Sequence, residues 1–253
     1  MERTDPTSES TLGARRSRLP RSLFVAVSVA VVLAGVFSYL LIAHKSQQSP
    51  VGQIRASGLP DDVSTSLGNL MELSPVPARP APAFVLTDQT GHAVSLASFR
   101  GHPVVLEFMD SHCVDICPIV SQEFVDAHRD LGTAASVVFV AVNVNPYHAS
   151  VADVADFSAE HQLDSIPTWH FFTGSAQALS AVWHAYGVDV EAPNPNADIV
   201  HSSFVYFIDP HGDERYLANP TDDHTANGTA YLPAGQLTSW GRGIAAVARS
   251  LGS

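Results

Sequence analysis

The chain of 253 residues has only two cysteines, Cys113 and Cys117, which lie four positions apart and directly ahead of Pro118. Residues at this spacing share one face of a helix, with their Cβ atoms roughly 5–6 Å apart. A disulfide prefers about 3.8 Å between Cβ atoms and would need a distorted turn, whereas a metal ion held between two thiolates bridges the wider gap. Metal binding and thiol–disulfide exchange are therefore the two chemistries open to this pair.

The surroundings of the pair favour reactive sulfurs. The nearly continuous apolar run at 103–109 predicts a buried strand that leads to the cysteines, and a helical pattern follows Pro118. Unpaired N–H groups at a helix start favour thiolate over thiol, and proline is tolerated in a first turn. A purely structural disulfide is disfavoured, because closing so short a loop stabilises far less than the roughly 3 kcal/mol of a 15-residue loop.

The charge distribution restricts the class of partner. The formal net charge is −12, and the residues after Pro50 hold 7 basic and 22 acidic side chains. Phosphate groups repel such an acidic body, so a nucleic-acid partner is excluded. A cationic partner or a metal ion fits better.

The N-terminal part predicts a membrane anchor. Residues 23–43 are 21 residues without a charge, long enough to cross a hydrocarbon core of roughly 30 Å, and Arg15, Arg16, Arg18 and Arg21 lie just before them. A cleaved signal peptide is the alternative, although the apolar stretch exceeds the usual length. We expect a cytoplasmic segment at 1–22, a single-pass anchor at 23–43, a Pro/Ser-rich tether at 44–82, and an extracytoplasmic domain at 83–253 in the cell membrane.

The pattern beyond residue 83 predicts an α/β sandwich with an N-terminal β-hairpin, and the order of its elements resembles the thioredoxin-like fold. A hairpin at 84–96 is followed by strands and helices in alternation, a second hairpin around 203–218 and an amphipathic closing helix. Ser150 with Asp153 predicts a capping box. Right-handed crossovers place the cysteines at a solvent-facing crevice beside the end of the first central strand.

A family resemblance rests on these motifs. SHCVDICP is similar to the T-H-C-P-D-x-C-P stretch of the SCO/SenC family, thioredoxin-like proteins that bind copper and assist the assembly of cytochrome c oxidase. The resemblance continues in order through FVLTDQTG, ASFRGHPVVLEF, FFTGSAQALSAVWHAYGV and DIVHSSFVYFIDPHG. It covers Phe84 to about Tyr216, over half of the chain.

The resemblance implies a ligand set and a role. The family's third copper ligand is a histidine before a late strand, which falls on His201, so Cys113, Cys117 and His201 are the expected metal ligands. Two thiolates and an imidazole suit Cu(I), or Cu(II) with an added oxygen ligand, while zinc prefers a fourth ligand. The implied function is a copper metallochaperone for the copper-site subunit of cytochrome c oxidase, with another copper chaperone or a thiol reductant as a further partner.

The chain departs from the family pattern at three places. Val114 replaces a proline, Val200 replaces an acidic residue, and the stretch 145–150 reads NPYHAS where the family has D-P-E-R-D-T. His112 neighbours the pair but is expected to point away from the sulfurs. Further histidines offer a loose outer metal-collecting surface, although most surface histidines bind nothing: His148, His211 and His224.

Two other functions remain open. A thiol–disulfide oxidoreductase would use Cys113 and Cys117 as a redox-active catalytic pair that reduces the oxidase's copper-site cysteines. Three residues between the cysteines, and no proline at 200–202, favour metal instead. A peroxiredoxin-like peroxidase fits less well, because its Pro-x-x-x-Thr-x-x-Cys signature is missing.

Overall fold

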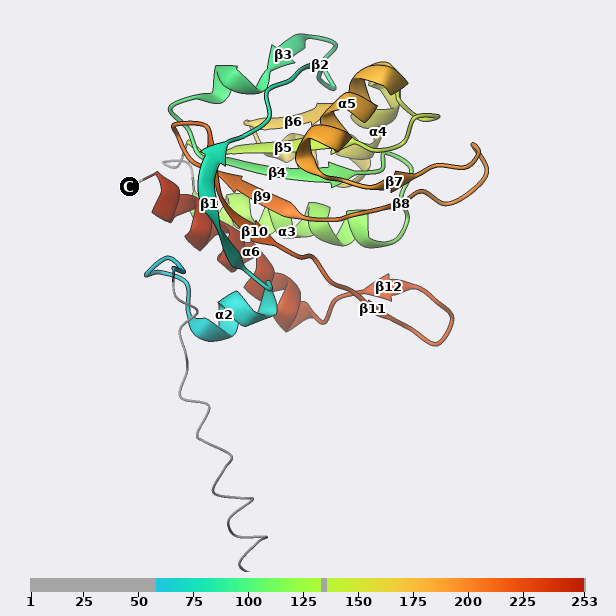
Figure 1. Ribbon diagram of the computed structural model, residues 1–253. Helices are drawn as coiled ribbons and strands as arrows, with labels where there is room; N and C mark the ends of the chain where they lie inside the picture. The colour runs from blue at the N-terminus through green and yellow to red at the C-terminus, as the bar shows by residue number, and fades with distance from the viewer. Residues whose placement is uncertain (1–57, 133–135, 253) are drawn as a thin grey trace, which may run out of the picture. The chain divides into compact units, whose positions relative to one another are not determined.

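The computed structural model describes residues 58–132 and 136–252, which belong to one compact unit. Its centre is a six-stranded sheet in the order β1-β10-β9-β4-β5-β6 (Figure 1). Strands β4, β5 and β6 are parallel to one another, whereas β9 is antiparallel to β4 and β10 to β9. The strands are β1 (Ser74–Pro80), β4 (Val104–Met109), β5 (Val138–Asn143), β6 (Trp169–Phe172), β9 (Val205–Ile208) and β10 (Asp213–Ala218).

Helices cover both faces of this sheet. Side chains of α3, α4 and α6 pack on one face, and those of α5 pack on the other face beneath the β2–β3 hairpin (Figure 1). The short helix α2 lies against α6. The bounds are α2 (Thr65–Leu70), β2 (Val85–Thr87), β3 (Ala93–Ser95), η1 (Leu96–Phe99), α3 (Ile116–Leu131), α4 (Val151–Glu160), η2 (Leu163–Ser165), α5 (Ala176–Tyr186) and α6 (Ala234–Leu251).

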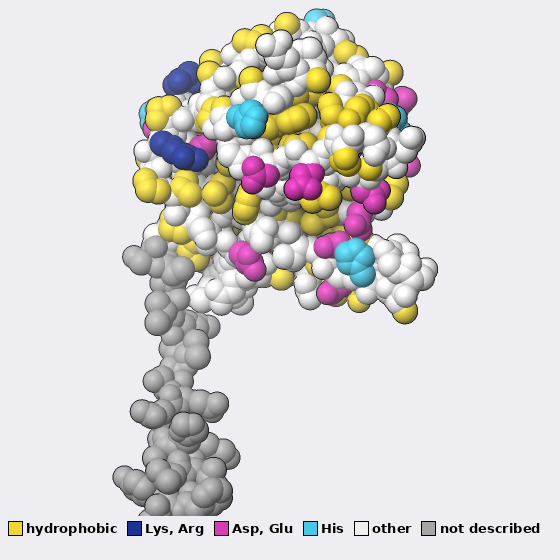
Figure 2. Space-filling view, turned by 45° about the vertical axis from the view of Figure 1, so that its right-hand side comes forward, with side chains coloured by type: hydrophobic (Ala, Val, Ile, Leu, Met, Phe, Trp, Pro, Cys, Tyr) yellow, Lys and Arg dark blue, Asp and Glu magenta, His cyan; other side chains and the backbone are white. Residues whose placement is uncertain are grey.

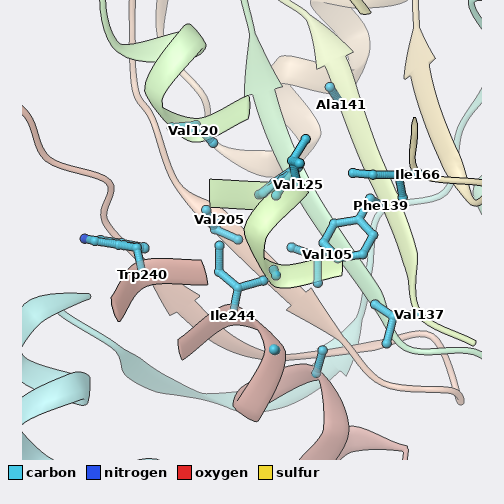
Figure 3. Close-up of a cluster of buried hydrophobic side chains, with 14 of the residues drawn as sticks. Val105, Val120, Val125, Val137, Phe139, Ala141, Ile166, Val205, Trp240 and Ile244 are labelled. Carbon is cyan, nitrogen blue, oxygen red and sulfur yellow. The ribbon is translucent and has the colours of Figure 1, made fainter. Parts of the chain in front are cut away.

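The core explains why β4 and β5 read as unbroken apolar runs. Every residue of both strands is buried, because helices cover the two faces of their parallel pair. Between the sheet and helices α3 and α6, Val105 and Phe139 pack with Ile244 (Figure 3). This core fixes the end of β4, where the cysteine loop begins, against the start of α3.

Two ribbons of two-residue strands extend from the body. Strand β7 (Val190–Glu191) pairs with β8 (Val200–His201), and β11 (Asp223–His224) pairs with β12 (Ala230–Tyr231). The partly buried Leu232 attaches the second ribbon to the core, and β12 lies against α3. The second ribbon is called the β11–β12 hairpin below.

The observed elements confirm the α/β sandwich and correct one boundary. The Ser150–Asp153 capping box is present at the start of α4. The stretch 74–80, which the sequence analysis assigns to the tether, instead forms β1 and pairs with β10. Because β1 lies at the sheet edge, it accepts three prolines that a central strand would not. The folded domain therefore starts before residue 83.

The predicted cytoplasmic segment and membrane anchor, 1–22 and 23–43, lie outside the described residues. Within the described ranges, none of the helices combines the length and apolar character needed to cross a bilayer. The anchor therefore stays a prediction.

Candidate metal and redox site

The two cysteines lie in the loop between β4 and α3. Cys113 is half-buried, Cys117 is 2% exposed, and both are free thiols. The sulfur of Cys113 accepts hydrogen bonds from the backbone N–H groups of Asp115 (3.4 Å) and Cys117 (3.5 Å). The sulfur of Cys113 thus accepts hydrogen bonds from N–H groups at the start of α3, whereas the side chain of the N-cap residue Asp115 accepts none of them.

The pKa values of the two thiols are shifted in opposite directions. A hydrogen bond from the Cys117 thiol lowers the pKa of Cys113 to about 7, with the two backbone N–H groups acting in the same direction. The same hydrogen bond and complete burial raise the pKa of Cys117 well above its usual range. Near neutral pH the site therefore holds a partly ionised, accessible Cys113 and a protonated, buried Cys117, the asymmetry expected of a reactive dithiol.

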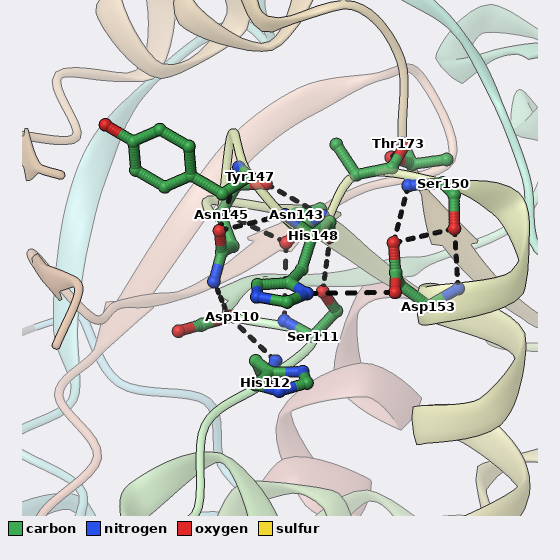
Figure 4. Close-up of polar contacts among 11 residues, drawn as sticks. Asp110, Ser111, His112, Asn143, Asn145, Tyr147, His148, Ser150, Asp153 and Thr173 are labelled. Carbon is green, nitrogen blue, oxygen red and sulfur yellow. Dashed lines mark hydrogen bonds and ion pairs between the residues drawn. The ribbon is translucent and has the colours of Figure 1, made fainter. Parts of the chain in front are cut away.

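Asp110 connects the cysteine loop to the rest of the fold. Its backbone carbonyl accepts a hydrogen bond from the N–H of Cys113 (3.2 Å). One carboxylate oxygen, Oδ1, accepts from the N–H of His112 and from Nδ2 of Asn145, each at 2.8 Å (Figure 4). Asp110 had no role in the sequence analysis, since a single acid beside a motif carries no signal of its own.

The loop after β5 supports the cysteine loop from the side. The side-chain amide of Asn143 donates to the carbonyl of His148, which also accepts from the hydroxyl of Ser111 at 2.6 Å. The ring of His148 stacks on that of His112 with centroids 3.8 Å apart (Figure 4). His112 therefore serves as a contact between the two loops.

His201 ends the short strand β8 and is half-buried. Its Nδ1 lies 3.0 Å from the carbonyl oxygen of Ser202. Burial lowers the pKa of His201, which favours the neutral imidazole that a metal requires, while the charge of Asp110 acts in the opposite direction. The charge of Asp110 also raises the pKa of Cys113 and of Cys117. All three predicted ligands therefore lie within the electrostatic reach of one carboxylate.

The ligand atoms of the three predicted ligands do not all lie within 4.8 Å of one another. In the described part of the chain, one group of three potential ligands has all its ligand atoms within 4.8 Å of one another, and it consists of Asp115, Asp222 and His224. The structure thus pairs Cys113 with Cys117 and leaves His201 further away than a shared ion requires.

A buried carboxyl group holds the segment that follows His201. Glu107, in the central strand β4, is 1% exposed, and its Oε1 accepts a 2.7 Å hydrogen bond from the hydroxyl of Ser203. Its other oxygen has no partner in the described structure. Burial raises the pKa of Glu107 to about 8. The role of Glu107 is not predictable from the sequence, because an acid within an apolar strand pattern shows no partner there.

The three outer histidines lie in different parts of the fold. His148 belongs to the loop network, and His211 is an exposed residue in the turn between β9 and β10. His224 faces Asp115 and Asp222.

The fold and this site define a class: an α/β domain with a free dithiol at the start of the first crossover helix. A family model described as SCO1/SenC matches residues 75–229, which is more than half of the chain. The chain belongs to the SCO1/SenC family, as its motifs predicted.

Curated relatives cover about half of this chain. A SCO1 protein homolog of Bacillus subtilis is 26% identical over 132 residues, a match that spans 51% of this chain and 68% of the Bacillus protein. The mitochondrial SCO2 homolog of Bos taurus is 30% identical over 136 residues, and the match spans half of that protein.

Solved structures confirm the thioredoxin-like fold. Apo Sco1 from Thermus thermophilus has a TM-score of 0.53 at 19% identity and covers 70% of this chain and 93% of its own. A copper-bound ScoI of Arabidopsis thaliana has a TM-score of 0.52 at 21% identity and covers 68% of this chain and 99% of its own.

Proposed function

We propose that this chain is a membrane-anchored copper metallochaperone that delivers copper to the copper site of cytochrome c oxidase. The observation that carries the proposal is the free Cys113–Cys117 pair, whose accessible sulfur has a pKa of about 7. Membership of the SCO1/SenC family supports it, as does the copper bound to the Arabidopsis relative. Residues 23–43 would anchor the chain with the domain on the extracytoplasmic side.

The donor set suits monovalent copper. Thiolates are soft ligands that select Cu(I), and a neutral imidazole is compatible with them. Cys113 supplies a sulfur that ionises near neutral pH, whereas Cys117 must lose its proton when copper binds. We therefore expect Cys113 to bind copper first and Cys117 to bind it second.

Binding by all three residues requires His201 to approach the sulfurs. Its strand β8 is two residues long and pairs only with β7 among the described strands, so a local shift of this ribbon breaks few hydrogen bonds. The anchor of the following segment is the hydrogen bond between Ser203 and Glu107. We expect the β7–β8 ribbon to rotate about this hydrogen bond and to bring His201 closer to the sulfurs.

A thiol–disulfide oxidoreductase that reduces the oxidase's copper-site cysteines is the second candidate. The unequal protonation of the pair favours it, because a thiolate of low pKa attacks a disulfide while a buried thiol resolves the mixed disulfide. The substrate disulfide gains two electrons and two protons, and Cys113 and Cys117 form a disulfide. His201 has no part in that exchange.

One experiment separates the two functions. Copper-loaded chain is mixed with the reduced, copper-free oxidase subunit, and reduced metal-free chain with the oxidised subunit, while copper transfer and thiol appearance are measured. The proposal expects His201→Ala to impair copper transfer and to leave thiol exchange intact, with His211→Ala as the control histidine. Dithiol exchange without transferable copper in the wild type would reject the chaperone function.

A further inference from the structure

A second group of potential ligands lies beside the dithiol. Nε2 of His224 is 3.3 Å from Oδ1 of Asp115 and 3.6 Å from Oδ2 of Asp222. The three ligand atoms all lie within 4.8 Å of one another. One imidazole nitrogen and two carboxylate oxygens therefore converge on one point from two distant parts of the sequence.

The fold brings these groups together from two elements. Asp115 lies between the two cysteines, and its side chain forms no hydrogen bond with the N–H groups of the helix that it precedes. The sulfur of Cys113 takes that position, which leaves the carboxylate of Asp115 directed toward His224. His224 belongs to the β11–β12 hairpin, which Leu232 joins to the core, and Asp222 directly precedes β11.

The local charge is negative and lacks an arginine partner. Ion pairs between described residues connect arginines to Glu214, Asp126, Asp209 and Asp130, and none of them includes Asp115 or Asp222. The only lysine of the chain is Lys45, outside the described residues. Figure 2 shows acidic and histidine side chains gathered where this hairpin meets the body. Among the described residues, His224 is the basic side chain that contacts these two carboxylates.

We propose that Asp115, Asp222 and His224 form a separate site for a divalent cation of intermediate softness, Cu(II) in preference to Zn(II). Imidazole and carboxylate ligands select these ions over Cu(I), which prefers the sulfurs, and the exposed side chains of Asp115 and His224 leave positions for water beside the half-buried Asp222. The site does not depend on the proposed function. It gives the chain a nitrogen–oxygen site whose ligand Asp115 lies two positions from each of the two cysteines.

The test removes the sulfur site so that the second site is seen alone. The full-length variant Cys113→Ser/Cys117→Ser/His201→Ala is titrated with Cu(II) and examined by electron paramagnetic resonance. One equivalent of Cu(II) with nitrogen and oxygen ligands is expected. Adding His224→Ala or Asp115→Asn is expected to weaken binding by about ten-fold or more, whereas adding His184→Ala, on α5, leaves it unchanged.

A second measurement keeps the native cysteines. The wild-type chain, carrying one equivalent of Cu(I), is dialysed against Zn(II), and bound zinc is counted with and without His224→Ala. One bound zinc that the variant loses supports the site. No stoichiometric Cu(II) or Zn(II), or binding that both His224→Ala and Asp115→Asn leave unchanged, would overturn it. Failure of Cu(I) loading would instead count against the proposed function and leave the first titration valid.

Discussion

At the scale of single residues, the site depends on how Asp110 and Asn145 join the cysteine loop to the loop after β5. The family pattern has its acid at the position of Asn145, where this chain has an amide. Asn145 donates to the carboxylate of Asp110 and accepts from the N–H groups of Tyr147 and His148. The chain thus has one carboxylate between the two loops, located on the cysteine side.

A substitution at Asn145 tests this arrangement. Asn145→Asp would replace the 2.8 Å hydrogen bond to Asp110 with two carboxylates in contact at a buried position. Like charges disfavour each other's ionised forms, so we expect lower stability by about 1–3 kcal/mol, measured by urea unfolding at pH 7. Asn145→Ala, which adds no charge, is the comparison. Equal stability of Asn145→Asp and the wild type would contradict the role given to this contact.

The thiol asymmetry gives a second prediction. Because the pKa of Cys113 is about 7, its thiolate fraction and its alkylation rate are expected to rise with pH and reach half their maximum near pH 7. Cys117→Ala removes the hydrogen bond that stabilises the thiolate, so the midpoint should move to higher pH. Iodoacetamide kinetics between pH 5 and 9 measure both. An unchanged midpoint in the variant would show that Cys117 does not lower this pKa.

At the scale of elements, the central strand β4 contains a buried acid that opposes folding at high pH. Burial raises the pKa of Glu107 to about 8, well above that of an exposed glutamate. Glu123 on α3 is fully buried, both of its oxygens lack a partner in the described structure, and its pKa is raised in the same way. Glu107 is therefore protonated in the folded domain at neutral pH, and burial shifts Glu123 in the same direction.

This leads to a stability prediction with a definite sign. Below about pH 4.3 both folded and unfolded forms are protonated; above it the unfolded chain ionises, and folded Glu107 follows only near pH 8. Stability is therefore expected to fall with rising pH across that window, by up to the order of 5 kcal/mol for this group. Urea unfolding of Glu107→Gln should show a flatter dependence. A slope equal to that of the wild type would contradict the assignment.

The elements also show what the sequence could predict. Long periodic or unbroken apolar segments such as β4 and α6 are predictable, because their patterns reflect burial. Ribbons of two residues, β7–β8 and β11–β12, are too short to show a period. The position of His224 next to Asp115 follows from one such ribbon, so the sequence alone did not predict it. The cysteine pair was predictable, since its two members lie in one motif.

At the scale of the whole molecule, the folded domain depends on residues before the predicted boundary at 83. Strand β1 completes the sheet at the exposed side of β10, and Arg79 within it pairs with the buried Glu214 at 2.6 Å. Met71 is fully buried in the core on the α6 side. The proline-rich composition of residues 74–80 predicts an extended tether. Composition does not show that these residues pair with β10 at the sheet edge.

Truncation tests this boundary. A chain that begins at residue 58 is expected to fold like the full-length protein, whereas one that begins at residue 83 loses β1 and α2. The second chain would expose the edge of β10 and leave Glu214 buried without its arginine, a type of loss that costs about 3–5 kcal/mol. Thermal unfolding and gel filtration compare the two chains. Equal stability of the two chains would show that the folded domain starts at residue 83.

The affinity for Cu(I) shows whether Cys113, Cys117 and His201 together hold one copper ion. Reduced, oxygen-free wild-type chain is titrated against a Cu(I) chelator alongside Cys113→Ser, Cys117→Ser and His201→Ala, with His211→Ala as the matched control. We expect one tightly bound Cu(I) in the wild type, an affinity lower by about ten-fold or more in His201→Ala, a larger decrease in each serine variant, and no change in the control. Binding that is unchanged in His201→Ala would contradict the three-ligand site, and no binding in the wild type would contradict the copper function.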